Sequence, residues 1–303
     1  MSTVLITGGT GLIGKLLCSA LHEQGYSIKL LSRTVSSQST YPTFHWNPDT
    51  HQISQDAFKD VDYIVHLAGE NIGEQRWSEN RKKRILESRM LSGQLLLDTI
   101  QQKGIALKGF ISASAIGYYG GITSKKIFSE DDGAATDFLG QVCQAWESTA
   151  QGVADLGIRT TTLRIGVVLT PTGGALSKLA FPIRLWAGAA LGSGRQYLPW
   201  IHVDDLIAII SNSIRDEKVS GVYNAVAPQH ITNEDMTKQI AQILKRPLLL
   251  PRIPGFILKL IMGEMSAIVL EGSRVSSGKI ENEGFSFLYP EVDQALKNLL
   301  KGD

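Results

Sequence analysis

The feature that most constrains this chain is a run of glycines directly after its first apolar stretch. From residue 7 the run reads Thr7, Gly8, Gly9, Thr10, Gly11, Leu12, Ile13 and Gly14. Gly8 permits a tight turn, Gly11 lets the backbone approach a pyrophosphate, and Gly14 allows a helix to pack closely on a strand. The N-terminus of that helix would offer free N–H groups and the positive end of a dipole to an anion. The run therefore predicts a dinucleotide site between a first strand and a first helix.

Short apolar runs alternate with longer helical patterns over the first two thirds of the chain. The runs of strand length are Val4–Thr7, Ser27–Ser32, Tyr63–Ala68, Gly109–Ser112 and Thr160–Ile165. The helical patterns between them are Leu12–Gln24, Glu79–Gln102 and Phe138–Leu156. Nearly continuous apolar strands are typical of a parallel sheet that is covered on both faces. We therefore predict an α/β fold, a Rossmann-type doubly wound parallel sheet with a smaller, mostly helical substrate domain.

The regular alternation of apolar runs and helical patterns ends after Arg164. This change determines the domain boundaries that we expect. Residues 170–200 are rich in glycine and proline without a sustained period, which predicts an irregular insertion on the substrate side. A further strand near Gly221–Ala225 is expected to rejoin the sheet. Residues 1–165, with a returning segment at about 200–226, would form the nucleotide-binding domain. Residues 166–199 and 227–303 would form the substrate-side and C-terminal domain.

Three later segments have recognisable patterns. A helix is expected near Asn233–Leu244, and a last amphipathic helix near Pro290–Leu300, with Pro290 in its first turn. Ile253–Val269 is more apolar than one solvated helix face requires. We favour core packing for this segment, with a cover over the substrate cleft or a homodimer contact as alternatives.

Net charge and composition limit the classes of partner that this chain is expected to bind. The chain has 30 Lys and Arg against 29 Asp and Glu, so its net charge of +1 gives no general attraction to nucleic acid or to an anionic membrane. Cys18 and Cys143 lack ligand spacing, the six histidines form no metal motif, and no signal peptide precedes the first strand. We expect a cytoplasmic protein with a small-molecule ligand and no metal.

The end of the second predicted strand indicates which dinucleotide is bound. NAD sites usually carry an acidic residue there, but this chain has Ser32, Arg33 and Thr34. Because an arginine can clamp a 2′-phosphate, we predict NADP(H) as cofactor. The third strand ends in Leu67, Ala68 and Gly69, where small residues would let the backbone lie against the cofactor. His66 before them is expected to be a packed strand residue.

Several motifs resemble the extended short-chain dehydrogenase/reductases, the NAD(P)-dependent epimerase/dehydratase superfamily. They are TGGTGLIG, HLAGENI, RW at 76–77, SASAIGYYG, RIGVVL, GSGRQYLPWIHVDD and GFSFLYPEVDQALKNLL. Together they are similar to the divergent "epimerase family protein" subgroup, which has its own C-terminal domain of unknown function. The resemblance implies NADP(H) binding in the N-terminal domain and leaves the substrate unassigned.

The superfamily's usual Tyr and Lys, spaced YxxxK on one helix, are missing. None of the eight tyrosines has a lysine four residues later, and Leu139 and Cys143 occupy the corresponding places. By resemblance, Ser114 would orient the substrate oxygen. Tyr118 or Tyr119 could replace the proton donor, or both could pack against the nicotinamide or the substrate loop.

Further polar residues are candidates for the substrate side of the cleft. They are Arg76, Arg89, Arg164, Arg195, Gln196, Trp200, His202 and Asp204. Several positive groups would suit an acidic or phosphorylated ligand. For Arg164 and for Asp204, as a helix cap, we favour structural roles, as for Trp146 and Glu147; His202 is either an acid/base or a packed histidine.

Two functions are consistent with these residues. The first is an NADP(H)-binding oxidoreductase or epimerase-like protein that acts on a small molecule. The alternative is a non-catalytic regulatory or scaffold protein that depends on NADPH.

Overall fold

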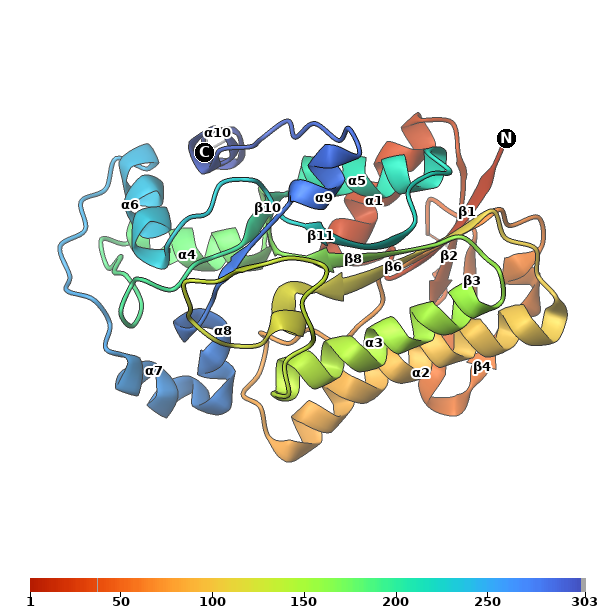
Figure 1. Cartoon of the computed structure of the whole chain (residues 1–303), viewed down its shortest axis with the longest axis horizontal. Helices are drawn as coiled ribbons and strands as arrows, with labels where there is room; N and C mark the ends of the chain where they lie inside the picture. The colour runs from red at the N-terminus through yellow and green to blue at the C-terminus, as the bar shows by residue number, and fades with distance from the viewer. Residues whose placement is uncertain (37, 301–303) are drawn as a thin grey trace.

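Among residues 1–36 and 38–300, which the computed structural model describes, eight strands form one sheet (Figure 1). Their spatial order is β11-β8-β6-β5-β1-β2-β3-β4. The strands are β1 (Thr3–Thr7), β2 (Ser27–Ser32), β3 (Thr43–Asn47), β4 (Gln52–Ile53), β5 (Tyr63–His66), β6 (Gly109–Ala115), β8 (Thr160–Ile165) and β11 (Gly221–Ala225). All neighbouring strands are parallel except β3 and β4, which pair antiparallel.

The strands predicted from apolar runs are confirmed, with small changes at their ends. β5 ends at His66, two residues earlier than expected, and β6 continues to Ala115. β3 and β4 were not predicted. They lie at the sheet edge and are mostly half-buried or exposed, so they lack the continuous apolar run of the inner strands.

Helices cover both faces of the sheet, as a doubly wound fold requires (Figure 1). On one face lie α1 (Leu12–Glu23) and α5 (Val203–Arg215), and on the other α2 (Glu79–Lys103) and α3 (Phe138–Asp155). Leu17 and Leu21 of α1 share one buried cluster with α5 and the sheet, whereas Leu96 of α2 and Val153 of α3 belong to another. The fold is therefore a Rossmann-type α/β sheet, as predicted.

A second apolar core lies beside the sheet. It contains residues of α4 (Gly174–Arg184), α6 (Asn233–Ile243) and α10 (Val292–Leu300), together with Trp200. Next to it, β9 (Val167–Leu169) and β10 (Trp200–His202) pair as a separate parallel ribbon. Residues on both sides of β11 thus build this core, while β11 itself completes the main sheet.

Two predictions about this region are wrong. The supposed irregular insertion contains α4, because Leu176, Ala180 and Ile183 lie on one face and their burial outweighs the cost of Pro182 inside the helix. Pro290 is not in the first turn of the last helix, which begins only at Val292.

The chain from residue 253 onward is the least regular part. It includes α7 (Gly255–Met262), α8 (Ala267–Leu270), α9 (Gly278–Asn282) and β12 (Arg274–Val275), which pairs with β7 (Ile127–Phe128). A short turn of 3-10 helix, η4 (Gly263–Ser266), follows α7, and three others lie earlier in the chain: η1 (Pro48–Thr50), η2 (Gln55–Phe58) and η3 (Ile116–Tyr119). Core packing of residues 253–269 is wrong for α7: its eight residues are all described and none is buried. In the described part of the chain, no helix has the length and apolarity to cross a membrane.

Asp205 fastens the C-terminal tail to the sheet domain. Its side chain is fully buried in the first turn of α5, and its carboxylate accepts hydrogen bonds from the backbone N–H groups of Leu288 (2.7 Å) and Tyr289 (3.1 Å). The tail then continues into α10 of the second core. One buried carboxylate therefore joins the two cores.

Replacing Asp205 by alanine should destabilise the protein by about 2–4 kcal/mol, because two N–H groups lose a charged acceptor. Asp204→Ala is the matched control, since the neighbouring side chain is 53% exposed and should cost less than about 1 kcal/mol. Urea unfolding followed by circular dichroism measures both. Equal losses in the two variants would show that this carboxylate does not hold the tail.

Candidate functional site

The glycine turn between β1 and α1 is packed too closely for side chains. A Cβ on Gly14 would lie 2.1 Å from the carbonyl oxygen of Gly8. Gly8 has φ +72°, and a Cβ there would lie 3.0 Å from the backbone of both Leu67 and Ala68. The turn is thus pressed between its own helix and the segment that follows β5. This is the arrangement predicted from the glycine spacing.

The N-terminus of α1 is open toward solvent. Among the described residues no side chain caps it, and its N-cap is Gly11, whereas Ser78, Asp137 and Thr232 cap α2, α3 and α6. Thr10, Gly11 and Leu12 are exposed. First-turn N–H groups without a capping oxygen are suited to bind a phosphate.

A buried histidine ties this turn to the end of β5. Thr7 Oγ1 lies 2.7 Å from His66 Nδ1 and accepts a hydrogen bond from the Ala68 N–H, while His66 Nε2 lies 3.3 Å from Ser92 Oγ. Because Ser92 Oγ donates to the Arg89 carbonyl, these contacts fit a neutral ring that donates from Nε2 and accepts at Nδ1. Burial lowers the pKa of His66 to about 3. His66 is therefore a packed strand residue, as predicted.

Three arginines gather around Glu70, in the segment that follows β5. Arg81 binds Glu70 at 2.5 Å, and this hydrogen bond lowers the pKa of Glu70, with further lowering by the charges of Arg84 and Arg33. Arg33 is exposed. Three positive charges around one carboxylate leave an excess that suits a phosphate monoester.

Arg89 of α2 is a buried cation beneath Gly69. Its side chain donates to the Ile85 carbonyl (3.1 Å) and lies over the Trp146 ring (4.7 Å), and within the described residues it makes no ion pair. A Cβ on the exposed Gly69 would come within 3.1 Å of the Arg89 Cζ. Burial lowers the pKa of Arg89 to about 10, which leaves it charged at neutral pH.

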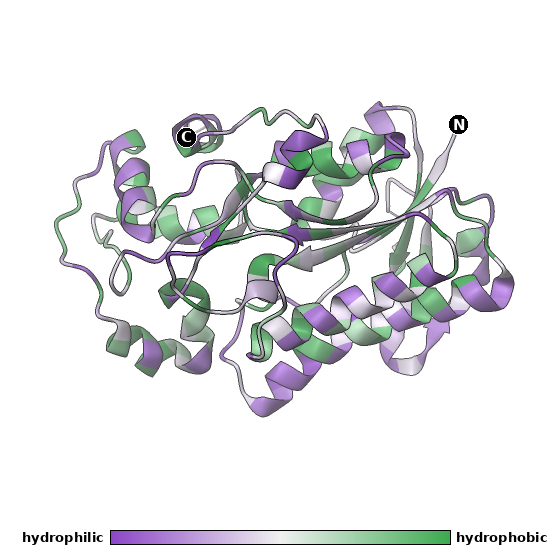
Figure 2. Ribbon diagram, viewed as in Figure 1, coloured by the Kyte–Doolittle hydropathy of each residue, from purple (hydrophilic) through white to green (hydrophobic). Residues whose placement is uncertain are grey.

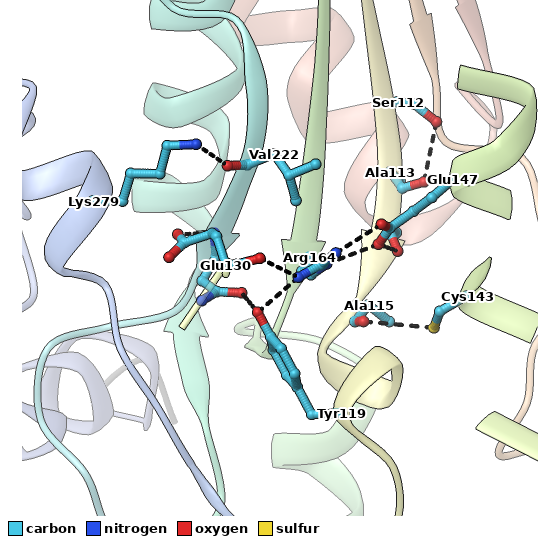
Figure 3. Close-up of polar contacts among 12 residues, drawn as sticks. Ser112, Ala113, Ala115, Tyr119, Glu130, Cys143, Glu147, Arg164, Val222 and Lys279 are labelled. Atoms are coloured by element: carbon cyan, nitrogen blue, oxygen red, sulfur yellow. Dashed lines mark hydrogen bonds and ion pairs between the residues drawn. The ribbon is translucent and has the colours of Figure 1, made fainter. Parts of the chain in front are cut away.

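A second polar network occupies the face expected to be catalytic (Figure 3). Arg164 binds both carboxylate oxygens of Glu147 at 2.9 Å, and the Ser114 hydroxyl donates to Glu147 at 2.7 Å. Arg164 also donates to the Tyr119 hydroxyl (3.0 Å), and its Cζ lies 3.4 Å from the centre of the Tyr118 ring. Burial opposes the charge on Arg164, but the hydrogen bonds and charge of Glu147 keep its pKa above the ordinary value.

This network decides what the predicted catalytic residues touch. Ser114 is 2% exposed and is directed at Glu147. Tyr119 is buried, donates to Asn224 Oδ1 (2.7 Å), and has its pKa raised to about 12 by burial. Tyr119 therefore belongs to the core network and is poorly placed to donate a proton to a ligand. Tyr118 is only half-buried.

A cavity of about 530 Å³ lies beside the N-terminal end of α3, with α7, η4 and α8 as its other wall. Trp77, Phe138 and Leu139 contribute apolar surface, so the position expected of the family tyrosine does face a cavity. The charged residues that line it are Asp137, Lys259, Glu264 and Glu271. Three carboxylates and one lysine do not favour the acidic or phosphorylated ligand that we expected from the sequence.

Comparison with known proteins gives the same family as the motifs. The model of the NAD dependent epimerase/dehydratase family matches residues 4–226, and a domain of unknown function, DUF1731, matches residues 253–299. The chain belongs to the NAD dependent epimerase/dehydratase family. The resemblance read from the sequence, including its C-terminal domain, is confirmed.

Relatives in this family match over nearly their whole length. "Epimerase family protein ML0860" of Mycobacterium leprae is 33% identical over 97% of this chain and 94% of its own. "Epimerase family protein SDR39U1" of Mus musculus is 32% identical over 98% of this chain and 99% of its own. The crystal structure of human epimerase family protein SDR39U1 (isoform 2) with NADPH has a TM-score of 0.87 and 30% identity, and covers 99% of both chains.

The remaining substrate-side candidates differ in how exposed their side chains are. Gln196 is buried and donates to the carbonyls of Leu191 and Val269, and Trp200 is fully buried and donates to the carbonyl of Gln229. These two predictions are wrong because both side chains pack between elements. Arg195 is exposed. Arg76 is exposed beside Gly263, near the cavity wall.

His202 has the capping role that we expected of Asp204. His202 is 1% exposed, accepts from the Asp204 N–H through Nδ1 (3.0 Å), and stacks on Tyr289. The histidine, and not Asp204, therefore caps α5. His202 is packed and is not a cleft acid, and burial lowers its pKa.

Two arginines beside the segment that follows β5 were missed from the sequence. Arg84 was not singled out, and Arg89 was placed with the substrate candidates. Both lie on α2, more than forty residues after the glycine turn, so only the packing of α2 under the sheet brings them to the ends of β2 and β5. The excess of arginine at the start of α2 is the signal that could have found them.

Stability should fall as the pH drops below about 6.5, because His66 stays neutral in the folded protein to about pH 3 while the unfolded chain takes up a proton. The loss should approach about 1.4 kcal/mol per pH unit for this group. His66→Gln should lower stability at pH 7 but flatten the dependence between pH 7 and 5. Urea unfolding at pH 7, 6 and 5 measures this.

His45→Gln is the control, because His45 is exposed on β3. It should keep the slope of the parent protein. Some slope should remain in His66→Gln, since burial also lowers the pKa of His202. An unchanged slope in His66→Gln would contradict the assignment of a neutral buried ring.

Proposed function

We propose that this protein binds NADP(H) along the carboxyl ends of β1, β2 and β5 and exchanges hydride with a small molecule held in the cavity beside α3. The observation that carries the proposal is the meeting of an uncapped helix N-terminus with an excess of arginine at neighbouring strand ends. The human relative that was crystallised with NADPH supports it.

The described residues fit this cofactor in three places. The exposed backbone at Thr10 and Leu12, at the uncapped N-terminus of α1, would bind the pyrophosphate, and Arg33 the 2′-phosphate. The Gly11 N–H already donates to the Gly8 carbonyl at 3.0 Å. The segment after β5 would support the nicotinamide half. Bound NADPH would supply the hydride, so the protein must position the substrate and exclude competing water.

Arg89 would supply the fixed charge that the missing lysine provides in the family. Cys143 holds the lysine's place on α3; burial raises its pKa to about 12, and the nearby charge of Arg89 acts in the opposite direction. Trp146, three residues further along α3, lies directly on Arg89. A guanidinium from α2 therefore reaches the region that the lysine of α3 serves in relatives, and we assign it to the nicotinamide ribose.

The cavity indicates a neutral or cationic substrate of modest size. Its apolar side chains would hold a hydrocarbon portion, and its carboxylates would disfavour phosphate or carboxylate groups. With Leu139 in place of the tyrosine, α3 offers no phenol to the substrate oxygen. Turnover would thus lack a proton path that is commonly worth about 10²–10⁴ in rate.

Ser114 and Tyr119 donate their hydroxyl protons to Glu147 and Asn224, so neither is free to act on a substrate. This favours an alternative, a regulatory protein that binds NADPH without turnover. In that case the cavity wall formed by residues 253–270 would respond to the cofactor. Hydrogen–deuterium exchange of this segment with and without NADPH tests it. If NADPH leaves the exchange of this segment unchanged, the regulatory alternative is contradicted, because it requires this segment to respond to the cofactor.

Arg33→Ser should weaken NADPH binding by roughly 10- to 100-fold, the loss of one charge-assisted contact, and leave NADH binding nearly unchanged. Fluorescence titration with each nucleotide measures this. Arg215→Ser is the control, because Arg215 is an exposed arginine in the last turn of α5. If the parent protein binds neither nucleotide at micromolar concentration, the proposal fails.

Arg89→Met should weaken NADPH about tenfold or more and leave 2′,5′-ADP, which lacks the nicotinamide half, unaffected. Arg33→Ser should weaken both ligands, so the pair separates the two ends of the site. Arg89→Lys should restore part of the NADPH affinity. Parallel losses of both ligands in Arg89→Met, together with a lower melting temperature, would give Arg89 a purely structural role.

A further inference from the structure

One corner of the molecule is both basic and apolar. Residues 245–263, here called the α7 corner, contain Lys245, Arg246, Arg252 and Lys259 and no acidic residue. The chain as a whole has a net charge of only +1, so this is a local excess. Figure 1 shows the segment after α6 following the outer edge of the molecule to α7 at its end, far from the sheet.

Several apolar side chains of the α7 corner are exposed to solvent. Exposed fractions are 72% for Phe256, 76% for Leu260 and 62% for Ile261 on α7, and 68% for Leu249 before it. Figure 2 shows α7 largely in the colour of hydrophobic residues. Such side chains are usually buried, and each leaves apolar area in water at a free-energy cost.

The end of α4 extends the same surface. The Arg246 guanidinium lies over the Trp186 ring at 5.0 Å, and Trp186 is 49% exposed. Leu185 beside it is 60% exposed. Further along, Ile253 forms a parallel bridge with Leu191, so the two stretches of chain lie side by side. The exposed apolar surface thus comes from two segments that support each other.

The charges at this corner are mostly available to an outside partner. Arg252 pairs with Glu234 at 2.7 Å. Within the described residues, Lys245, Arg246 and Lys259 make no ion pair. Exposed aromatic and aliphatic side chains flanked by free lysine and arginine are the pattern of segments that lie in a lipid–water interface.

We propose that the α7 corner binds the surface of an anionic lipid bilayer. Phe256, Leu260 and Ile261 would enter the boundary between headgroups and acyl chains, and Lys245 and Arg246 would contact the phosphates. At eight residues, α7 is about 12 Å long, so it would lie on the membrane and not cross it. This inference does not depend on the cofactor.

A second copy of the chain fits this surface less well. A two-fold contact brings the same patch of both copies together, which would place the unpaired cations of one copy against those of the other. A bilayer with anionic headgroups removes that repulsion. It also needs no groove that matches a protruding helix, because lipid chains adapt to the side chains that enter.

The test is flotation of the full-length protein with two kinds of vesicle: phosphatidylcholine alone, and phosphatidylcholine with about 30% phosphatidylserine. We expect binding to the anionic vesicles in 50 mM salt and at least about a tenfold loss in 500 mM salt, since the headgroup attraction is screened. Phe256→Gln/Leu260→Gln/Ile261→Gln should reduce binding at least about tenfold. Lys245→Gln/Arg246→Gln should reduce it about fivefold per charge.

Leu288→Gln is the matched control, because Leu288 is 66% exposed outside the α7 corner. It should bind vesicles like the parent. Melting temperature should be unchanged in the triple variant and in Leu288→Gln, because the substituted side chains are mostly exposed. In Lys245→Gln/Arg246→Gln it should fall only slightly, through the lost contact of Arg246 with the Trp186 ring. Absence of parental binding, or binding that the triple variant retains, would overturn the proposal. Sedimentation showing a dimer that the triple variant abolishes would also overturn it, in favour of a second copy.

Discussion

The close contact between the glycine turn and the end of β5 is the constraint on which the site depends. Gly8 lies against the backbone of residues 67 and 68, and Gly14 lies against the carbonyl of Gly8. The Thr7 and His66 side chains hold the two strands in this register from beneath. Because these atoms leave no room for side chains, the N-terminus of α1 opens toward the ends of β2 and β5. The exposed Arg33 and Gly69 then face one region, and α2 brings Arg84 and Arg89 to it.

The buried pair of Glu147 and Arg164 has a comparable influence on the opposite side of the site. Removing one member of such a pair leaves an uncompensated buried charge, so both members must stay in place. Neighbouring polar side chains then hydrogen-bond to the pair. Ser114 and Tyr119 hydrogen-bond to it and not to the cavity. The cavity itself has Leu139 at the place expected of the family tyrosine. This arrangement explains why a family member with a well-formed nucleotide turn has an unusual substrate side.

Charge is distributed unevenly although the total is close to zero. Arginines gather at the ends of β2 and β5, carboxylates line the cavity beside α3, and lysine and arginine flank the exposed apolar residues of α7. Each region would attract a different ligand: a phosphate, a neutral or cationic molecule, and an anionic surface. The net charge of the chain therefore says little about what it binds, because attraction at short range depends on local groups.

The sequence by itself determined the inner strands, the helices that cover them and the nucleotide turn, because buried parallel strands and a strand–glycine–helix junction are local patterns. It also determined that YxxxK is absent, which is a matter of spacing along one helix. Only the tertiary structure decided the rest. Arg89 came to lie beneath Gly69, and Gln196, Trp200 and His202 became packing residues, because their partners come from distant segments. α4 forms in spite of Pro182 for the same reason. Its apolar face packs on residues of α6 and α10, which are distant in the sequence. The composition of α7 likewise did not predict its exposure. An apolar segment can be buried or exposed, and only the fold shows which of its faces other elements cover.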